Sequence, residues 1–165
     1  MNAIDIALTV SIVLCSLVAG LVFAFAVVVM PGIKGLNDHD FLQAFQMMDR
    51  VIQNNQPIFV FVWLGSVVAV VTLGLLGIWH LDGINCTLAI LALAIYLFGV
   101  QLPTATINIP LNNQLQTQSL DAMSESELRE ARKKFEPRWT LWNSIRAVLA
   151  TVTTVLLIVL ALRLR

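Results

Sequence analysis

The sequence predicts an all-α integral membrane protein: a four-helix bundle with two amphipathic extramembrane helices on one side. Three observations predict this class. Of the 165 residues, 58% are hydrophobic and only 12% are charged, whereas a soluble domain is about 45–50% apolar and about 25% charged. The apolar residues form four stretches, each near the roughly 20 residues that a helix needs to cross a bilayer core. The charged residues lie almost entirely between these stretches.

Four transmembrane helices account for most of the chain, so we expect residues 1–165 to form one membrane domain. The expected spans are residues 4–30, 57–79, 85–108 and 143–162. The first stretch is too long for the apolar region of a signal peptide, and no lysine or arginine precedes it. We therefore interpret it as a permanent helix that ends at Pro31-Gly32. Pro57 suits the first turn of the second span.

Two segments between the spans have the pattern of amphipathic helices. In residues 38–53, apolar residues recur at helical spacing, namely Phe41, Phe45, Met48 and Ile52. In residues 124–136, Ser124 and Glu127 form the pattern of a capping box at a helix start, and we expect Pro137 to end that helix. The two helices could lie flat on the membrane surface or cover the end of the bundle, and the sequence leaves both arrangements open.

Four crossings place residues 31–56 and 109–142 on one side of the membrane, and residues 80–84 with both chain ends on the other. The first side carries the basic residues Lys34, Arg50, Arg129, Arg132, Lys133, Lys134 and Arg138. The second side carries Arg163 and Arg165. Because basic loops tend to stay in the cytoplasm, we expect a multi-pass plasma (inner) membrane protein with cytoplasmic long loops and both termini outside. The net charge of zero gives no support for a nucleic-acid partner.

Polar side chains within the spans gather near the end of the bundle that carries the long loops. Gln101, Thr104 and Asn108 share one face of the third span, at i, i+3 and i+7. Asn143 and Arg146 lie within one turn of the fourth span. Polar groups at membrane depth are costly and tend to face the bundle interior or a cavity, so we predict a site where these residues meet. The alternative is structural: hydrogen bonds between helices, with the arginine reaching the headgroups.

The histidines give no support for a metal or haem site. His39 and His80 fall on opposite sides of the membrane, about 30 Å apart, so they cannot share a metal ion. His39 lies in a helix-start sequence in which Asn37 or Asp38 is the expected N-cap, although it could also act as a base or bind a metal weakly. The sequence has no histidine pair at helical spacing, phosphate-binding glycine loop or nucleophile elbow, and we expect no cofactor.

Three stretches of the sequence together resemble the anthrone oxygenase-like family of small four-helix integral membrane proteins. Residues 30–59 are similar to its Met-Pro-Gly turn followed by an amphipathic helix that contains a glutamine. Residues 108–115 (NIPLNNQL) resemble its Asn-Val-Pro-x-Asn-x-x-Leu signature. Residues 135–147 (FEPRWTLWNSIRA) resemble its Arg-Trp-x-x-Trp-Asn-x-x-Arg signature. The chain departs from the family pattern at Asp49, where asparagine is common, and before Pro57, because a proline often follows the first asparagine of the loop directly, whereas here Asn55 and Gln56 precede it.

The resemblance implies an oxygenase, because fungal members oxidise anthrones to anthraquinones with molecular oxygen and no classical cofactor. It implies that Arg146 stabilises an oxyanion while Asn143 or Asn108 donates hydrogen bonds, and that Asp49 or His39 is the base. The residues expected to bind the aromatic substrate are Trp139, Trp142, Asn112, Asn113, Gln46 and Gln101. Either tryptophan could instead be an anchor at the membrane interface.

A second class of function remains open. The chain could be a non-enzymatic membrane protein that binds a lipid or small hydrophobe, or a small subunit of a membrane complex. A transporter is the third possibility, but one short four-helix unit offers little pathway unless it forms a homo-oligomer. A cavity beside Arg146, Asn143 and Asn108 would favour the enzyme.

Overall fold

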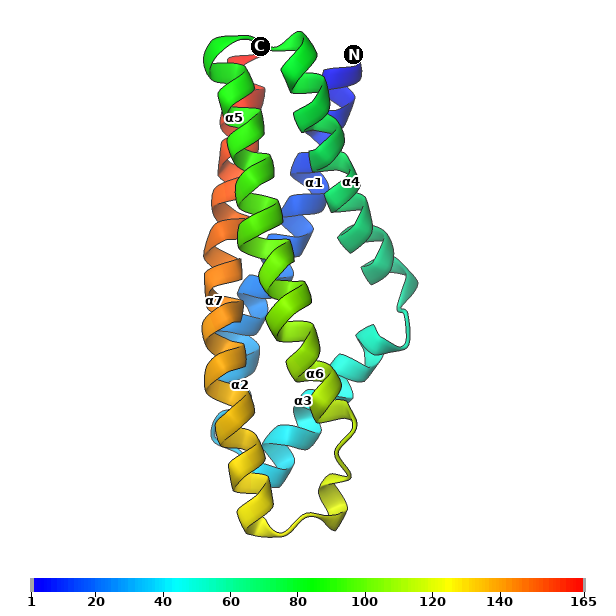
Figure 1. The fold of residues 1–165 in the computed structure, drawn as a ribbon, viewed down its shortest axis with the longest axis vertical. Helices are drawn as coiled ribbons and strands as arrows, with labels where there is room; N and C mark the ends of the chain where they lie inside the picture. The colour runs from blue at the N-terminus through cyan, green and yellow to red at the C-terminus, as the bar shows by residue number, and fades with distance from the viewer. Residues whose placement is uncertain (1, 165) are drawn as a thin grey trace.

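The computed structural model describes residues 2–164 and contains helices but no strand within that range (Figure 1). Four helical stretches are long and apolar enough to cross a membrane: Ala3–Ile33, Pro57–His80, Gly83–Gln116 and Glu125–Arg163. The predicted fold class is therefore confirmed, and the chain is a multi-pass membrane protein. Arg165, which entered the charge argument above, lies outside the described residues.

The first stretch consists of α1 (Ala3–Ala24), the π-helical turn η1 (Phe25–Val29) and α2 (Met30–Ile33). A capping box between Asn2 and Asp5 starts it. The expected end at residue 30 is wrong, because the helix continues through Pro31 to Ile33. After a short turn, α3 (Asp38–Gln53) begins at its N-cap Asn37, and the predicted helix over residues 38–53 is confirmed.

The second and third stretches form a hairpin. The second is α4 (Pro57–His80) and the third comprises α5 (Gly83–Ala94), η2 (Ile95–Gln101), η3 (Thr104–Asn108) and α6 (Ile109–Gln116). The predicted end of the third span at residue 108 is wrong. The helix continues for two further turns through Pro110, so that the segment 108–115 is helical.

Wide turns explain why three prolines do not end these helices. A proline inside a helix lacks an N–H donor, and its ring meets the carbonyl four residues earlier. Directly before Pro31, Pro103 and Pro110, the backbone forms a π-type hydrogen bond to the carbonyl five residues back. The donor and acceptor pairs are Met30 to Phe25, Leu102 to Leu97 and Ile109 to Thr104. Each wide turn makes room for the ring and lets the helix continue.

The fourth stretch is one helix, α7 (Glu125–Arg163), after the short η4 (Leu120–Ala122). The expectation of one helix over 124–136 and another over 143–162 is wrong, since α7 passes through Pro137 without a break. Pro137 and Lys133, whose carbonyl loses its donor, are both exposed, so that this carbonyl can bind water. With 39 residues, α7 is about 58 Å long, about twice the thickness of a bilayer core.

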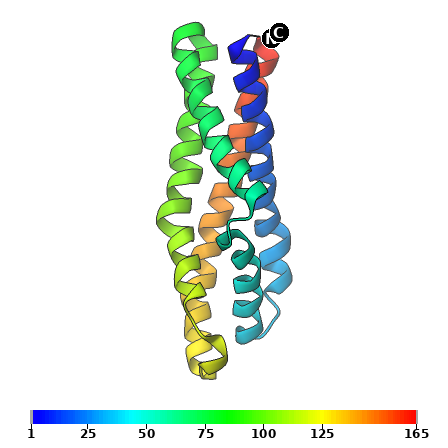
Figure 2. The same cartoon turned by 90° about the vertical axis from the view of Figure 1, so that its right-hand side faces the viewer.

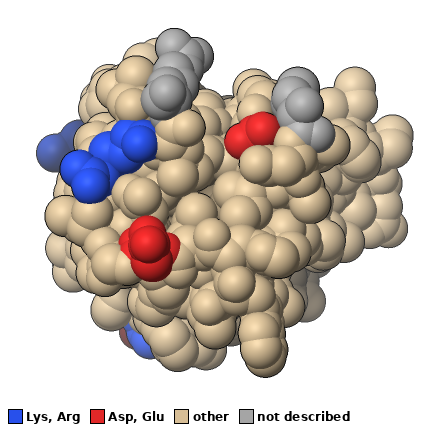
Figure 3. Space-filling view, turned by 90° about the horizontal axis from the view of Figure 1, so that it is seen from above, with Lys and Arg blue, Asp and Glu red and all other residues tan. Residues whose placement is uncertain are grey.

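The long helices pack in the cyclic order α1, α4, α5 and α7. Both described chain ends and the α4–α5 turn lie at one end of the bundle, and the other connections lie at the opposite end (Figures 1 and 2). The end with the termini shows few charged side chains (Figure 3). Outward-facing residues of the bundle such as Phe61 and Phe98, each 69% exposed, are apolar, as contact with a lipid bilayer requires.

The helix α3 covers the opposite end of the bundle rather than extending away from it. It packs against α6 and α7, and its Phe41 and Phe45 are buried in a cluster with Phe135 and Trp139. This aromatic cluster closes the bundle at the level where the polar residues of the spans are found.

Candidate functional site

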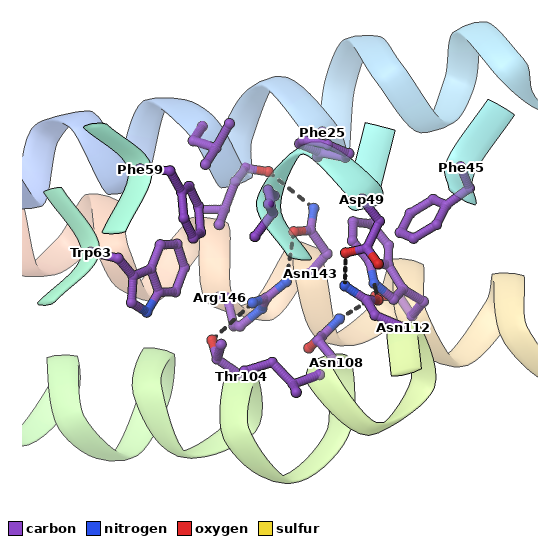
Figure 4. Close-up of a pocket in the computed structure, with 15 residues that line it drawn as sticks. Phe25, Phe45, Asp49, Phe59, Trp63, Thr104, Asn108, Asn112, Asn143 and Arg146 are labelled. Carbon is purple, nitrogen blue, oxygen red and sulfur yellow. Dashed lines mark hydrogen bonds between the residues drawn. The ribbon is translucent and has the colours of Figure 1, made fainter. Parts of the chain in front are cut away.

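A cavity of about 160 Å³ lies between the four membrane-spanning stretches and α3 (Figure 4), and the third stretch contributes to it through η3 and α6. Its walls are mostly apolar and aromatic. The lining residues are Leu21, Val22, Phe25, Phe45, Asp49, Ile52, Phe59, Trp63, Thr104, Asn108, Ile109, Asn112, Trp139, Asn143 and Arg146. An apolar cavity of about 150 Å³ holds a benzene molecule, so this one has room for an aromatic ring.

Arg146 lies on the inner face of α7 and is only 5% exposed. Its Nη1 donates to Thr104 Oγ1 at 2.8 Å, and its Nη2 donates to Asn143 Oδ1 at 3.0 Å. Its Nε has no hydrogen-bond partner. Both partners are neutral, and within residues 2–164 no carboxylate pairs with this guanidinium. Its positive charge is therefore uncompensated at the wall of an apolar cavity, which favours an anionic ligand or transition state.

Asn143 and Asn108 are also buried, and neighbouring carbonyls fix the orientation of their amides. Asn143 Nδ2 donates to the Val22 carbonyl at 3.0 Å, which leaves its Oδ1 to accept from Arg146. Asn108 Nδ2 donates to the Trp139 carbonyl at 3.3 Å, and its Oδ1 has no partner. In Figure 4 both asparagines lie between Arg146 and Asp49.

Asp49 brings a carboxylate to the same cavity from the inner face of α3, where it is 4% exposed. Three amide groups donate to it: Asn112 Nδ2 at 2.7 Å, Gln116 Nε2 at 2.9 Å and Gln53 Nε2 at 3.2 Å. A carboxylate has about four acceptor positions, so one remains open. No basic side chain pairs with Asp49 in the described part of the chain. The cavity thus contains a carboxylate and a guanidinium that do not neutralise each other.

Aromatic rings form much of the remaining wall. The Trp139 ring packs edge-on against Phe45, with centroids 4.9 Å apart, and lies tilted against Phe25, with centroids 5.7 Å apart. Trp139 is buried in the wall rather than placed at the membrane surface. On α4, Phe59 and Trp63 stack at 5.3 Å. Flat apolar surfaces therefore face the polar groups across the cavity.

Six of the residues predicted for the site line the cavity. They are Arg146, Asn143, Asn108, Asp49, Trp139 and Asn112. Phe25, Phe59 and Trp63 contribute to the wall and were not predicted. Thr104 was placed on the polar face of the third span, and its role as an Arg146 partner was missed.

The other five predicted residues do not line the cavity, and four of them have other partners. Gln46 donates to two backbone carbonyls of the α6–η4 region, and Gln101 accepts from the Trp63 indole at 2.9 Å. Asn113 is exposed and accepts from Gln53. Trp142 lies on a different face of α7 from Trp139 and is partly exposed.

His39 lies at the outer end of α3, away from the cavity. Its ring nitrogens contact Asp40 Oδ1 at 3.2 Å and Asp121 Oδ1 at 3.0 Å. The hydrogen bond with Asp40 makes the largest contribution to raising the pKa of His39 above its ordinary value, and the hydrogen bond with Asp121 makes the next largest. Of the two bases considered, only Asp49 lies at the site. Residues 2–164 contain no cluster of three or more histidine, cysteine, aspartate or glutamate side chains that could hold a metal.

A protein-family model described as anthrone oxygenase matches residues 45–156 of the chain. The matched region includes α3 from Phe45 onward, the hairpin, α6 and most of α7, and therefore all the polar residues of the cavity. Searches of curated proteins and of solved structures give no match.

Proposed function

Because the chain belongs to the anthrone oxygenase family, we propose that it is a membrane-embedded oxygenase that oxidises a lipophilic, anthrone-like aromatic substrate with molecular oxygen and no cofactor. The observation that carries the proposal is the placement of Arg146 and Asp49. Both are buried in the wall of one aromatic cavity, and neither is neutralised by the other or by another charged residue within residues 2–164. This combination suits a substrate that loses a proton and gains negative charge on oxygen.

An anthrone has a CH₂ group between two aromatic rings and a carbonyl opposite it. In the proposed reaction Asp49 uses its open acceptor position to take a CH₂ proton. The electrons move to the carbonyl oxygen, and the resulting oxyanion accepts a hydrogen bond from the free Nε of Arg146. Burial strengthens this interaction because little water competes for the charge.

The electron-rich carbon then forms a bond to molecular oxygen. The reduced dioxygen group takes a proton and becomes a hydroperoxide. Loss of the remaining proton on the same carbon, with cleavage of the O–O bond, forms the second carbonyl and releases water. One anthrone and one O₂ thus give one anthraquinone and one water.

The cavity wall also suits an apolar substrate that arrives through the bilayer. Ile109 lines the cavity and is 45% exposed on the lipid-facing side of the bundle. Phe59 and Ile52, on α4 and α3, are partly exposed. A planar molecule dissolved in the membrane would reach Arg146 without crossing the charged loops, and rings beyond the one that the cavity holds would extend past these exposed residues toward the bilayer.

The experiment is an oxygen-uptake assay on the purified protein in lipid nanodiscs with anthrone at neutral pH, with protein-free nanodiscs to subtract spontaneous oxidation. We expect wild-type protein to consume equal amounts of anthrone and oxygen. Arg146→Gln should reduce kcat by about 100- to 1,000-fold, the usual effect of removing an oxyanion donor. The matched control is Arg163→Gln, at the opposite end of the bundle. Tight binding of anthrone without consumption by wild-type protein would contradict the proposal and favour a hydrophobe-binding protein.

A further inference from the structure

Two unpartnered polar atoms of opposite character belong to buried residues that line the same cavity. Arg146 Nε is a hydrogen-bond donor without an acceptor, and Asn108 Oδ1 is an acceptor without a donor. Both side chains are more than nine-tenths buried, at 5% and 2% exposed, and both line the cavity. Buried polar atoms nearly always have a hydrogen-bond partner. These two atoms therefore indicate a ligand that forms a hydrogen bond with each of them.

The orientation of the Asn108 amide determines what that ligand must offer. Its Nδ2 donates to the Trp139 carbonyl at 3.3 Å. The flipped amide would set two acceptor oxygens against each other, so Oδ1 is the free atom. A ligand atom that approaches Asn108 Oδ1 must therefore carry a hydrogen.

The two atoms also belong to one continuous wall. Arg146 Nη1 donates a hydrogen bond to Thr104 Oγ1 at 2.8 Å. Asn108 lies one helical turn beyond Thr104 on the same face of the third span. The donor from α7 and the acceptor from η3 are thus adjacent parts of one polar strip, opposite the rings of Phe59 and Trp63 (Figure 4).

We propose that Asn108 is a specificity-determining residue, and that the strip it forms with Arg146 selects a planar aromatic ligand with a phenolic hydroxyl over one with oxygens that only accept. The ligand oxygen accepts from Arg146 Nε, and a hydroxyl hydrogen is donated to Asn108 Oδ1. A ketone or ether satisfies the arginine but leaves the asparagine oxygen unpaired.

This inference deepens the proposed function and rests on it for the aromatic nature of the ligand. In an anthrone the carbonyl accepts from Arg146, and the hydroxyl that meets Asn108 Oδ1 is a separate phenolic group on the same ring system. The keto form thereby keeps the CH₂ group that Asp49 deprotonates.

The test uses two bicyclic probes that are not oxygenase substrates. 2-Naphthol donates and accepts, whereas 2-methoxynaphthalene only accepts. Binding to the full-length protein in nanodiscs is followed by probe fluorescence and corrected for partition into protein-free nanodiscs of the same lipid. We expect wild-type protein to bind the naphthol about tenfold more tightly than the ether, the effect of one buried hydrogen bond.

The variant Asn108→Leu, of similar size, should lower this ratio to about one, because it removes the acceptor. The matched control Asn113→Leu, on the exposed face of α6, should keep the wild-type ratio. Arg146→Gln should weaken the binding of both probes, since both accept a hydrogen bond. It should leave the ratio of their affinities mostly unchanged. Asn108→Ala serves as a second variant if the leucine variant does not fold.

Equal corrected affinities for the two probes in wild-type protein would overturn the inference, and this result needs no variant. A ratio that persists in a folded Asn108 variant would overturn it as well. Because the probes report binding alone, a naphthol preference without anthrone oxidation would contradict only the proposed function. Anthrone oxidation without the preference would contradict only this inference.

Discussion

The Trp139 indole N–H donates to Asn112 Oδ1 at 2.8 Å, and Asn112 in turn donates its amide hydrogen to Asp49 Oδ1 at 2.7 Å. This relay joins three segments that are far apart in the sequence: α7, α6 and α3. It fixes the Asn112 amide, because the oxygen must face the indole N–H and the nitrogen must face the carboxylate. The position of the proposed base thus depends on a tryptophan that is also part of the aromatic wall.

The first prediction tests this relay. Trp139→Phe keeps an aromatic ring in the wall but removes the N–H, so that Asn112 can rotate and Asp49 loses its fixed orientation. We expect the free energy of unfolding to fall by about 1 kcal/mol and kcat for anthrone to fall more than the affinity for 2-naphthol. Thermal unfolding, oxygen uptake and probe binding measure the three effects. Trp142→Phe, which lies outside the cavity, is the control, and an equal loss of kcat in that variant would contradict the relay.

The second prediction concerns the base itself. Asp49→Asn keeps the shape of the side chain but removes the group proposed to take the proton. We expect kcat to fall by about 100- to 10,000-fold, the usual contribution of a general base, while binding of 2-naphthol changes little. Asp82→Asn, in the α4–α5 turn, is the matched control. Activity close to wild type in Asp49→Asn would show that another group removes the proton.

The polar half of the site could be predicted because charge and polarity are rare inside a membrane. Asn108, Asn143 and Arg146 stand out in apolar sequence, and helical spacing places them at one depth. The aromatic half could not be predicted in this way. Phe25, Phe59 and Trp63 lie in helices that are apolar on every side, so that a side chain facing the cavity looks the same in the sequence as one facing lipid.

The helix ends show a second limit of the sequence. Pro31 and Pro137 were expected to end helices, because a proline inside a regular α-helix removes a hydrogen bond and clashes with the preceding turn. A π-type turn before Pro31, and solvent exposure around Pro137, relieve the steric and hydrogen-bonding problems instead. His39 shows a third limit. It lies on the same side of the bundle as the cavity, but Asp121, 82 positions away, holds it elsewhere.

The third prediction concerns pH. Hydrogen bonds with Asp40 and Asp121 raise the folded-state pKa of His39, so the folded state binds the proton more tightly than the unfolded chain does. The stabilisation is fully present below the unfolded pKa of about 6.5 and is lost as the pH rises through the higher folded value. The difference in Tm between wild type and His39→Gln should therefore shrink between pH 5.5 and 8.5. A difference that stays constant over this range would contradict the prediction, and His80→Gln is the control.

The fourth prediction concerns orientation in the membrane. The excess of basic residues in the long loops predicts that these loops are cytoplasmic. In a protein with Cys15 and Cys86 replaced by alanine, Ser119→Cys should resist a membrane-impermeant thiol reagent in intact cells, whereas Ile84→Cys should react. Both cysteines should react after the cells are opened. The opposite pattern in intact cells would reverse the predicted orientation.

The last prediction links the wide turns to the site. Pro110 follows η3, the turn that carries Thr104 and Asn108. Pro110→Ala restores an N–H and removes the ring, so that the backbone can return to regular α-helical hydrogen bonds. That change shifts the register of the turn and rotates both side chains away from Arg146. We expect Tm to stay the same or rise, while 2-naphthol binding weakens and its preference over the ether is lost. Pro137→Ala, at a proline without a wide turn, should leave binding unchanged. Weaker binding together with a lower Tm in Pro110→Ala would instead mean that the proline only supports the fold.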